Sequence, residues 1–404
     1  MKRCVIVGGG HAAAQLSVSL CQQGWDGSIT VLSDELSLPY HRPPLSKDYL
    51  SGEKSLKEIL IRPSAVYEKS NVQFNLGVRV ESILRDEMNV QLIDGNKIPY
   101  DKLVLTTGSR VRKLTIPGSD LAGLCYLRSI SDVNQIREFS GSGKKIVIIG
   151  GGYIGLEAAA ALKKLGMKVT VLEAMDRVLQ RITTQEISGF YTRVHNEEGV
   201  NIEVNAVAAS IEGTGQVEKV ICQDGRAFDA DLIIAGIGII PCDELAQQAG
   251  LDVDNGILVD QFSQTSDSKI LAAGDCTVHY NPIYDRHIRL ESVQNAVDQA
   301  KVAAATICGS PLAYKALPWF WSDQYDIKLQ IAGLSQGYDQ VVMRSDINTG
   351  RSFAAFYLKQ GKLLAVDAIN KPKEFMMGRR LIMRGNTVDP AKLADEQLPM
   401  KDLI

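Results

Sequence analysis

The sequence predicts an α/β protein with two domains built on parallel sheets and a smaller α+β domain at the C-terminal end. Three observations predict this fold class. A buried strand that leads into a glycine-rich turn, a helix and a second strand occurs twice, with the two turns 142 residues apart. Apolar strands that alternate with helices are typical of parallel sheets covered on both faces. From Pro318 onward the pattern changes to alternating strands and a basic helix, and 404 residues suffice for roughly three domains.

The composition excludes several classes of protein. Hydrophobic residues make up 45% and charged residues 23% of the chain, as in a globular protein rather than a disordered or fibrous one. The 44 basic and 47 acidic residues nearly cancel, so the charge does not indicate a nucleic-acid groove. No apolar run reaches the ~18 residues of a membrane-spanning helix.

The seven cysteines are scattered, and the closest pair lies 17 positions apart. They form neither a CxxC pair nor a zinc-ligand cluster, so we expect no metal site. Scattered thiols behave as small buried hydrophobic residues in a reducing compartment, which indicates a cytoplasmic protein.

The first copy of the repeated pattern consists of the strand Arg3–Val7, the turn Gly8–Gly10, a helix rich in alanine and the strand Ile29–Leu32. Glycines at such a turn permit a tight bend and let backbone amides approach a pyrophosphate at the helix N-terminus. Ala13 stands where the pattern GxGxxG has its third glycine, and Asp34 and Glu35 follow 21 and 22 residues later. These two acids are therefore candidates for binding a ribose.

The second copy consists of the strand Lys145–Ile149, the complete turn Gly150–Gly155 and the strand Val169–Leu172. Glu173 falls 18 residues after Gly155, where a carboxylate can accept from both ribose hydroxyls and would repel a 2′-phosphate. This position favours NADH over NADPH. Arg177 lies close enough in sequence to leave NADPH open.

Neither turn identifies a nucleotide site by itself, because glycine-rich turns also serve as plain connections between strand and helix. Two such turns in this context indicate FAD and NAD in one chain. The alternative is a pair of duplicated structural domains of which only one binds a nucleotide.

Each copy is followed by a stretch of short strands. Residues 72–107 predict a β-meander inserted into the first domain, with a hairpin turn at Asp94 and Gly95. A similar stretch after the second copy has a turn at Asp224 and Gly225, followed by a strand that leads to Gly238.

Five further motifs carry a family resemblance. They are Pro39–Lys47, Thr106–Gly108, Ala273–Cys276, Arg289–Ala296 and Pro318–Tyr325. In these motifs, and over essentially its whole length, the chain resembles the NADH-dependent ferredoxin reductases that serve oxygenases. The resemblance implies a fold of the glutathione-reductase type with two Rossmann-like domains. Its FAD-binding domain would be split into residues 1–112 and 240–318, around an NAD-binding domain at 113–239 and before a C-terminal interface domain at 319–404.

The resemblance also implies which residues contact the cofactors. For FAD they are Gly8, Gly10, Ala12, Asp34, Glu35, Arg42, Lys47, Val80, Thr107, Gly108, Arg128, Asp275, Glu291 and Val293. For NADH they are Gly150, Gly152, Ile154, Gly155, Glu173 and Gly236. The Asp275 carboxylate can accept a ribityl hydroxyl, and Val293 would offer its amide at a helix N-terminus. The charged residues among them could instead form ordinary surface ion pairs.

Lys47, Glu157 and Trp321 are placed by the resemblance beside the reactive edge of the flavin. A buried lysine needs a partner. Paired with Glu157, Lys47 could donate a hydrogen bond near the flavin N5 and stabilise the reduced ring; the alternative is a salt bridge between domains with no redox role. Trp321 either covers the flavin and controls the exit of electrons or simply belongs to the core.

The activity implied is the transfer of hydride from NADH to FAD and then of single electrons to an iron-sulfur ferredoxin, most simply of the two-iron type. That ferredoxin would feed an oxygenase, either a haem-thiolate monooxygenase or a ring-hydroxylating dioxygenase. Because the cofactors carry this chemistry, no acid–base pair or nucleophile is required. Disulfide reductases of this fold need a dithiol beside the flavin, and the sequence has no CxxC.

The basic helix near the C-terminal end could steer an acidic ferredoxin by electrostatic attraction, or it could be a merely solvated face. Between positions 371 and 384 the only acid is Glu374, and the five basic residues are Lys371, Lys373, Arg379, Arg380 and Arg384.

Two other functions stay open. The same half-reaction could serve rubredoxin, oxygen or monodehydroascorbate. A redox-switched interaction protein like apoptosis-inducing factor would have a long insertion in the last domain and a basic targeting run, and both are missing. The resemblance fits a monomer or a weak dimer.

Overall fold

The computed structural model describes residues 2–403, which form two compact units. The first unit contains the chain up to His41 together with residues 56–110 and 239–318. The second unit contains residues 42–55, residues 111–238 and the chain from Trp319 onward. In the part of the chain that is described, no helix is both long and apolar enough to cross a membrane.

The first unit is built on a five-stranded parallel sheet in the order β19-β7-β1-β2-β3. Its strands are β1 (Lys2–Val7), β2 (Gly27–Ser33), β3 (Val72–Leu76), β7 (Lys102–Leu105) and β19 (Ile270–Ala272). Four consecutive residues of β1, from Cys4 to Val7, are buried, as expected for a strand covered on both faces.

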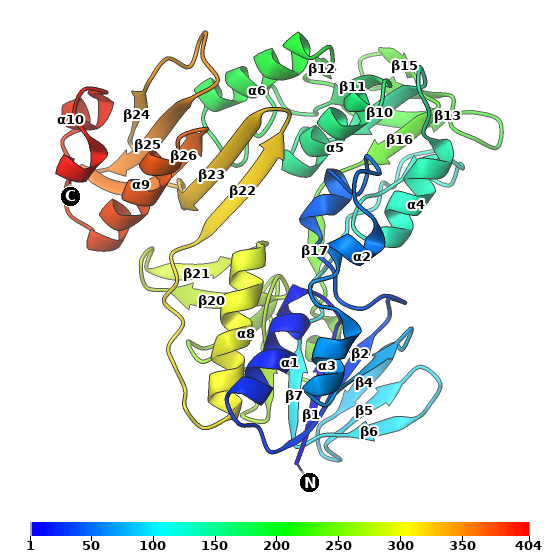
Figure 1. Cartoon of the computed structure of the whole chain (residues 1–404). Coiled ribbons are helices and arrows are strands. Elements are labelled where there is room, and N and C mark those ends of the chain that lie inside the picture. Colours follow the sequence, from blue (N-terminus) through cyan, green and yellow to red (C-terminus); the bar gives the residue numbers. More distant parts are fainter. Residues whose placement is uncertain (1, 404) are drawn as a thin grey trace. The chain divides into compact units, whose positions relative to one another are not determined.

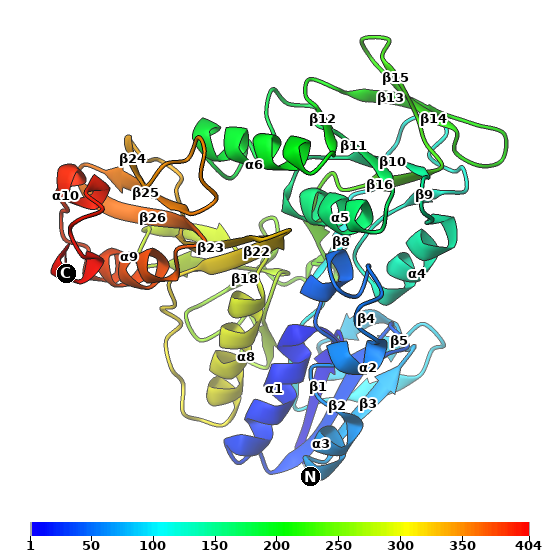
Figure 2. The same ribbon diagram turned by 45° about the horizontal axis from the view of Figure 1, so that its top comes forward.

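Two helices, α1 (His11–Gln22) and α8 (Val293–Ile307), lie side by side in this unit (Figures 1 and 2). Alanines on both helices belong to one buried cluster, in which small side chains let the two backbones approach closely. The shorter helices of the unit are α2 (Leu56–Ile59), α3 (Ser64–Lys69) and α7 (Glu244–Gln248).

The predicted meander at 72–107 is wrong at both of its ends. Only β4 (Val80–Leu84), β5 (Asn89–Leu92) and β6 (Lys97–Pro99) form an antiparallel meander. The strands before and after it, β3 and β7, belong to the parallel sheet, where they pair with β2 and β1. The turn at Asp94 and Gly95 is confirmed, and Gly95 has a φ of +86°, which glycine adopts without strain.

The remaining strands of the first unit are short. β18 (Ile257–Val259), β20 (Thr277–Asn281) and β21 (Arg286–Arg289) form a three-stranded sheet. Two further strands, β8 (Ser109–Val111) and β17 (Ile239–Pro241), occur where the chain passes from one unit to the other.

The second unit repeats the parallel architecture with a sheet in the order β12-β11-β10-β16-β9. Its strands are β9 (Leu124–Cys125), β10 (Lys145–Ile149), β11 (Lys168–Leu172), β12 (Asn201–Glu203) and β16 (Leu232–Ala235). Its helices are α4 (Ile130–Phe139), α5 (Tyr153–Lys164) and α6 (Gln185–Glu197). The antiparallel strands β13 (Ala208–Glu212), β14 (Lys219–Cys222) and β15 (Ala227–Asp229) include the predicted turn at Asp224 and Gly225.

The C-terminal part of the second unit is an antiparallel sheet in the order β22-β23-β26-β25-β24 (Figure 2). Its strands are β22 (Trp319–Gln324), β23 (Ile327–Gly333), β24 (Gln340–Arg344), β25 (Phe353–Lys359) and β26 (Lys362–Ile369). The helix α9 (Pro372–Arg384) packs on β23 and β26, and α10 (Pro390–Ala394) and the 3-10 turn η2 (Met400–Leu403) follow. Two parallel sheets and a separate antiparallel sheet in the C-terminal part confirm the predicted fold class.

Candidate functional site

The first glycine turn is held tightly against the end of β7. Gly8 has a φ of +108°, and a Cβ atom there would lie 2.2 Å from the backbone oxygen of Thr106. At Gly10, the N-cap of α1, a Cβ would meet no atom within 4 Å, and there is no side chain to cap the helix. The N-terminus of α1 therefore has open space beside Gly10 and no side-chain cap, which fits the diphosphate of a dinucleotide.

The second turn has the same construction. Gly150 has a φ of +116°, and a Cβ there would lie 2.4 Å from the backbone oxygen of Gly236. Gly152 caps α5 without a side chain and also faces open space. A Cβ on Gly155 would lie 2.2 Å from the oxygen of Gly150, so the third glycine is required by the close packing of α5 on the turn. Ile154 is exposed beside this turn, at 46%.

The acidic residues after the two copies are placed differently. Glu173 accepts hydrogen bonds from the backbone amides of Gly151, at 2.8 Å, and Met175, at 2.9 Å, so its carboxylate lies against the second turn. Asp34 is exposed, and Glu35 accepts from the hydroxyl of Tyr40.

Arg177 does not reach out toward a nucleotide. Its guanidinium Nη1 donates to the backbone oxygens of Thr183, at 2.9 Å, and Thr184, at 3.1 Å, and to the hydroxyl of Ser188, at 2.6 Å. Its Nη2 donates to the oxygen of Gln180 at 3.2 Å. The arginine is thus used to fix the segment between β11 and α6.

A second group of candidate FAD residues lies between β19 and α8 in the first unit. The carboxylate of Asp275 accepts from the hydroxyl of Ser109 at 3.1 Å. Gly274, just before it, has a φ of +94° and donates its amide to Gln299 at 2.8 Å. Val293 is the first residue of α8, so its amide is one of the free donors at that helix N-terminus.

The other candidates of the first unit are mainly backbone or packing positions. Thr107 donates its hydroxyl to the oxygen of Cys242 at 2.5 Å. Ala12 and Val80 are buried in the cores beside the sheet, with 5% and 8% exposure. Gly108 has a φ of +66°. Glu291 forms an ion pair with Arg289 at 2.6 Å.

In the second unit, Arg42 Nη1 donates to the backbone oxygen of Arg128 at 2.7 Å. This contact joins two segments that are far apart in the sequence. It also brings together two arginines that are both among the candidate FAD residues.

Lys47 and Glu157 form a close ion pair, with 2.8 Å between Nζ and Oε2. The Lys47 side chain is 15% exposed and that of Glu157 only 2%. Glu157 also accepts from the hydroxyls of Ser46, at 2.5 Å, and Ser322, at 2.6 Å. A buried carboxylate with three donors is well compensated, and the ammonium beside it retains some access to solvent.

Trp321 belongs to an aromatic group that extends toward α9. Its ring centroid lies 5.4 Å from that of Trp319, which in turn lies 6.2 Å from that of Phe375 in α9. Trp321 is half-buried, and residues alternate along β22, so it points to the opposite face from Ser322.

The sequence reasoning missed several polar residues that hold these candidates. Gln299 is 1% exposed and accepts from Gly274, Thr277 and Asn295. Ser46 and Ser322 lie inside the quoted motifs but had been given no role. In the structure Ser322 and Gln324 are buried and Asp323 between them is exposed, an alternation that the residue types of β22 do not signal.

All seven cysteines are free thiols. Burial raises the pKa of Cys4 and Cys125 to about 12 and that of Cys276 to about 11. Cys276, although next to Asp275, is therefore a packing residue and not a nucleophile.

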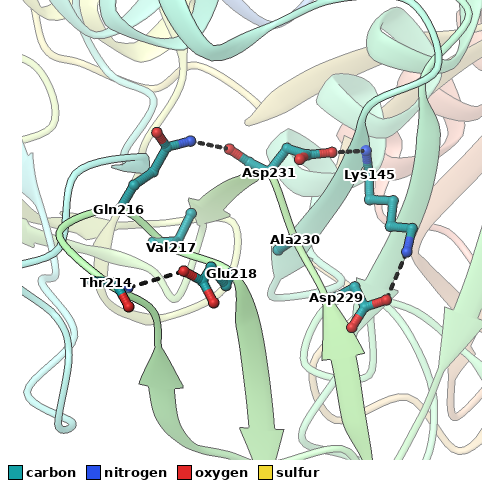
Figure 3. A pocket seen from close by; sticks show the side chains of 8 residues that line it. All are labelled: Lys145, Thr214, Gln216, Val217, Glu218, Asp229, Ala230 and Asp231. Atoms are coloured by element: carbon teal, nitrogen blue, oxygen red, sulfur yellow. Dashed lines mark hydrogen bonds and ion pairs between the residues drawn. The ribbon is translucent and has the colours of Figure 1, made fainter.

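A polar pocket of the second unit lies at the opposite end of the parallel sheet (Figure 3). Lys145 begins β10 and Asp231 immediately precedes β16, whereas the turn at Gly150 follows the carboxyl end of β10. Inside the pocket Lys145 pairs with Asp229 at 2.6 Å. Ligands of open α/β sheets bind beyond the carboxyl ends of the strands, so we assign no cofactor to this pocket.

The two glycine turns and the surrounding residues define a class of protein, the oxidoreductases that use a flavin and a pyridine nucleotide. Residues 2–300 match the family model described as pyridine nucleotide-disulphide oxidoreductase, and residues 319–404 match a reductase C-terminal domain. The chain therefore belongs to the pyridine nucleotide-disulphide oxidoreductase family.

Within that family the chain is similar to ferredoxin reductases. It is 42% identical to putidaredoxin reductase of Pseudomonas putida, over 99% of this chain and 96% of that protein. It is 43% identical to a ferredoxin–NAD(P)(+) reductase of Sphingomonas sp., over 99% of this chain and 97% of that protein. The crystal structure of the covalent putidaredoxin reductase–putidaredoxin complex matches it with a TM-score of 0.96 and 42% identity, covering 100% of this chain and 98% of that chain. The predicted resemblance is confirmed.

Proposed function

We propose that this chain is an FAD-dependent NADH:ferredoxin reductase whose ferredoxin feeds an oxygenase. The observation that supports this function most strongly is the duplicated glycine turn, in which Gly10 and Gly152 leave open space at the N-termini of two helices. When FAD is bound, it supplies the chemistry of the reaction, since it accepts a hydride and releases electrons one at a time. The protein binds and orients the two nucleotides.

The first glycine turn fits FAD and the second fits NADH. In the second turn, Glu173 would meet the ribose of the nicotinamide cofactor, and its negative charge opposes a 2′-phosphate. Arg177, the nearby cation that could have offset that phosphate, is held by backbone oxygens of its own segment. Both facts favour NADH over NADPH.

Lys47 and Glu157 are the residues that we assign to the reacting end of the flavin. The Lys47 ammonium would donate a hydrogen bond there and stabilise negative charge on the reduced ring. Glu157 keeps the ammonium in place, because the two groups are 2.8 Å apart and the carboxylate is almost wholly buried.

The helix α9 is the proposed docking surface for the ferredoxin. Lys373, Arg380 and Arg384 are exposed on it, and Met376 and Met383 add apolar contact area at 47% and 57% exposure. The one acid of the run, Glu374, is 8% exposed and is directed at Arg344, with 3.6 Å between them, so it does not offset the outer positive charge. The aromatic group of Trp321, Trp319 and Phe375 leads to this helix.

The double variant Arg379→Gln, Arg380→Gln tests the docking surface. We expect a higher KM for ferredoxin that depends more weakly on salt, and an unchanged rate with ferricyanide, because a small acceptor needs no docking. The matched control, Lys97→Gln with Lys168→Gln, removes the same charge from exposed positions elsewhere. An equal loss with both acceptors would contradict the assignment of α9.

The function itself is tested by comparing electron acceptors. Purified protein loaded with FAD would oxidise NADH in the presence of a two-iron ferredoxin, a Rieske-type ferredoxin or rubredoxin, measured side by side. We expect fast multiple turnovers with the two-iron ferredoxin. Turnover with rubredoxin alone would change the partner but keep the NADH half-reaction, whereas no turnover with any acceptor would favour a redox-switched interaction protein.

We further propose that the enzyme works in the cytoplasm as a monomer or weak dimer. A reducing compartment keeps thiols such as its seven free cysteines reduced. Sedimentation at several protein concentrations measures the oligomeric state.

A further inference from the structure

A continuous chain of polar side chains runs through the interior of the second unit and ends at Glu157. Tyr325 contacts His195 Nδ1 at 3.1 Å, and His195 Nε2 contacts Gln324 Oε1 at 2.8 Å. Gln324 Nε2 then donates to the Ser322 hydroxyl at 3.2 Å, and Ser322 donates to Glu157 Oε1 at 2.6 Å. Between Tyr325 and Glu157 the chain is buried, since His195 and Ser322 are 0% and Gln324 is 2% exposed.

Three elements bring these residues together. Ser322 and Gln324 are two positions apart on β22, so both point to the same face of the sheet. The helix α5, which carries Glu157, packs on β22. The helix α6 supplies His195 in its last turn.

The hydrogen bonds that link Tyr325 to Glu157 all run in the same direction. Burial lowers the pKa of His195 to about 4, so the ring is neutral near pH 7 and carries one N–H. Because Gln324 Oε1 can only accept, that N–H is on Nε2, and Nδ1 is left to accept from the Tyr325 hydroxyl. Each donor along the chain therefore points toward Glu157.

At the end of the chain both oxygens of the Glu157 carboxylate are occupied. Oε1 accepts from Ser322, and Oε2 accepts from Ser46 and Lys47. A carboxylate held at both oxygens cannot rotate without breaking a buried hydrogen bond. The orientation of Glu157 in turn fixes the direction of the Lys47 ammonium.

We propose that Ser322, Gln324 and His195 are positioning residues that hold Glu157, and through it Lys47, in the orientation needed for hydride transfer. The inference rests on the proposed function, in which Lys47 acts at the flavin. The Gln324 amide does not take up and release protons as an acid or base would, so the chain orients the carboxylate and does not conduct protons.

Two variants and one matched control test this role. Ser322→Ala removes the donor to Glu157, and Gln324→Leu removes the link to His195. For both we expect kcat with NADH and ferricyanide to fall by about tenfold with KM for NADH unchanged. Ser322→Ala loses the hydrogen bond to the Glu157 carboxylate itself, and Gln324→Leu removes the amide that holds the Ser322 hydroxyl in place to make it. The control Tyr357→Phe deletes a fully buried hydroxyl of the same unit that donates to Asp367 and not to Glu157. It should leave kcat unchanged.

A readout independent of activity comes from ¹⁵N NMR of the histidine side chains. We expect His195 to be in the Nε2–H tautomer in the parent protein and to become a mixture of tautomers in Gln324→Leu. An Nδ1–H tautomer in the parent would overturn the proposal, since the donors would then no longer point toward Glu157. So would an unchanged kcat in Ser322→Ala, or an equal fall in Tyr357→Phe. Failure of the proposed function would look different, because the parent enzyme itself would not reduce ferricyanide with NADH.

Discussion

The two glycine turns of this chain have the same backbone plan. The amide of Gly8 donates to Leu32, one residue before the end of β2, and that of Gly150 donates to Leu172, the last residue of β11, each at 2.8 Å. Both glycines have a positive φ, and both lie against the residue that follows the next strand of the sheet, Thr106 in one case and Gly236 in the other.

The turns differ where the nucleotides themselves differ. The strand register aligns Ser33 of the first copy with Glu173 of the second, whose carboxylate is bound to its own turn. Ala13, fully buried, takes the place of Gly155, so α1 leaves room for a methyl group that α5 does not. We therefore propose that the common plan holds a pyrophosphate in each copy and that a few side chains adapt each copy to its cofactor.

The largest expected effects come from filling the two open positions one at a time. Gly10→Val should give a folded protein that purifies without flavin and has lost all NADH oxidation. Gly152→Val should retain the flavin but no longer be reduced by NADH. Both residues have ordinary extended dihedrals, so valine causes no backbone strain. Flavin absorbance and NADH titration measure the two losses.

The proposed difference between the two glycine turns would be contradicted if both variants lost the flavin, or if both kept it and could still be reduced by NADH. Circular dichroism serves as the control for folding.

The next largest effect is at the third position of the pattern. Gly155→Ala should cost about 2–3 kcal/mol of stability and weaken NADH binding, because its Cβ would overlap the oxygen of Gly150. The reverse change in the first copy, Ala13→Gly, should cost only about 1 kcal/mol through helix propensity. Urea unfolding measures both, and similar costs would show that the helices pack alike.

A smaller effect is expected from giving the second copy the residue of the first. Glu173→Ser removes the carboxylate that opposes a 2′-phosphate, so the ratio of kcat/KM for NADPH to that for NADH should rise roughly tenfold. The matched control, Asp34→Asn, alters an exposed acid of the first copy and should leave this ratio unchanged. An unaltered ratio in Glu173→Ser would contradict the role of the carboxylate.

The last effect concerns a contact between Thr183, in the segment that follows the second copy, and Asp367 of the C-terminal sheet. Asp367 in β26 accepts from Thr183 at 3.0 Å and from Tyr357 at 2.5 Å, and burial raises its pKa from 3.8 to about 6. A carboxyl group whose pKa is raised by folding stabilises the folded state at low pH, and this contribution is lost as the pH rises through about 6.

Asp367→Asn should remove that dependence. Relative to the parent, the variant should gain on the order of 1 kcal/mol of stability per pH unit between pH about 4 and about 6. Unfolding in urea across this range measures the gain, and parallel curves for the two proteins would contradict it.

The sequence predicted those parts of the fold and site that local patterns encode. Glycine at a required positive φ and strands buried on both faces leave clear traces, so both turns and both parallel sheets were found. The strands β3 and β7 were assigned to a meander because a strand of only four or five residues does not reveal which strand it pairs with.

The parts that could not be predicted depend on contacts between distant segments. Gln324 reaches His195 across 129 residues, and Gln299 reaches Gly274 across 25. No pattern in one sequence signals such contacts. The pair Lys47 and Glu157 was anticipated only through the resemblance, and the structure brings the two side chains together, while their redox role stays a prediction.

The central claim, that the two turns bind two different cofactors that exchange electrons, is tested most directly by an anaerobic titration of the FAD-loaded protein with NADH. We predict that stoichiometric NADH bleaches the visible absorbance of the flavin and that an oxidised two-iron ferredoxin restores it. A flavin absorbance that NADH leaves unchanged would contradict the account.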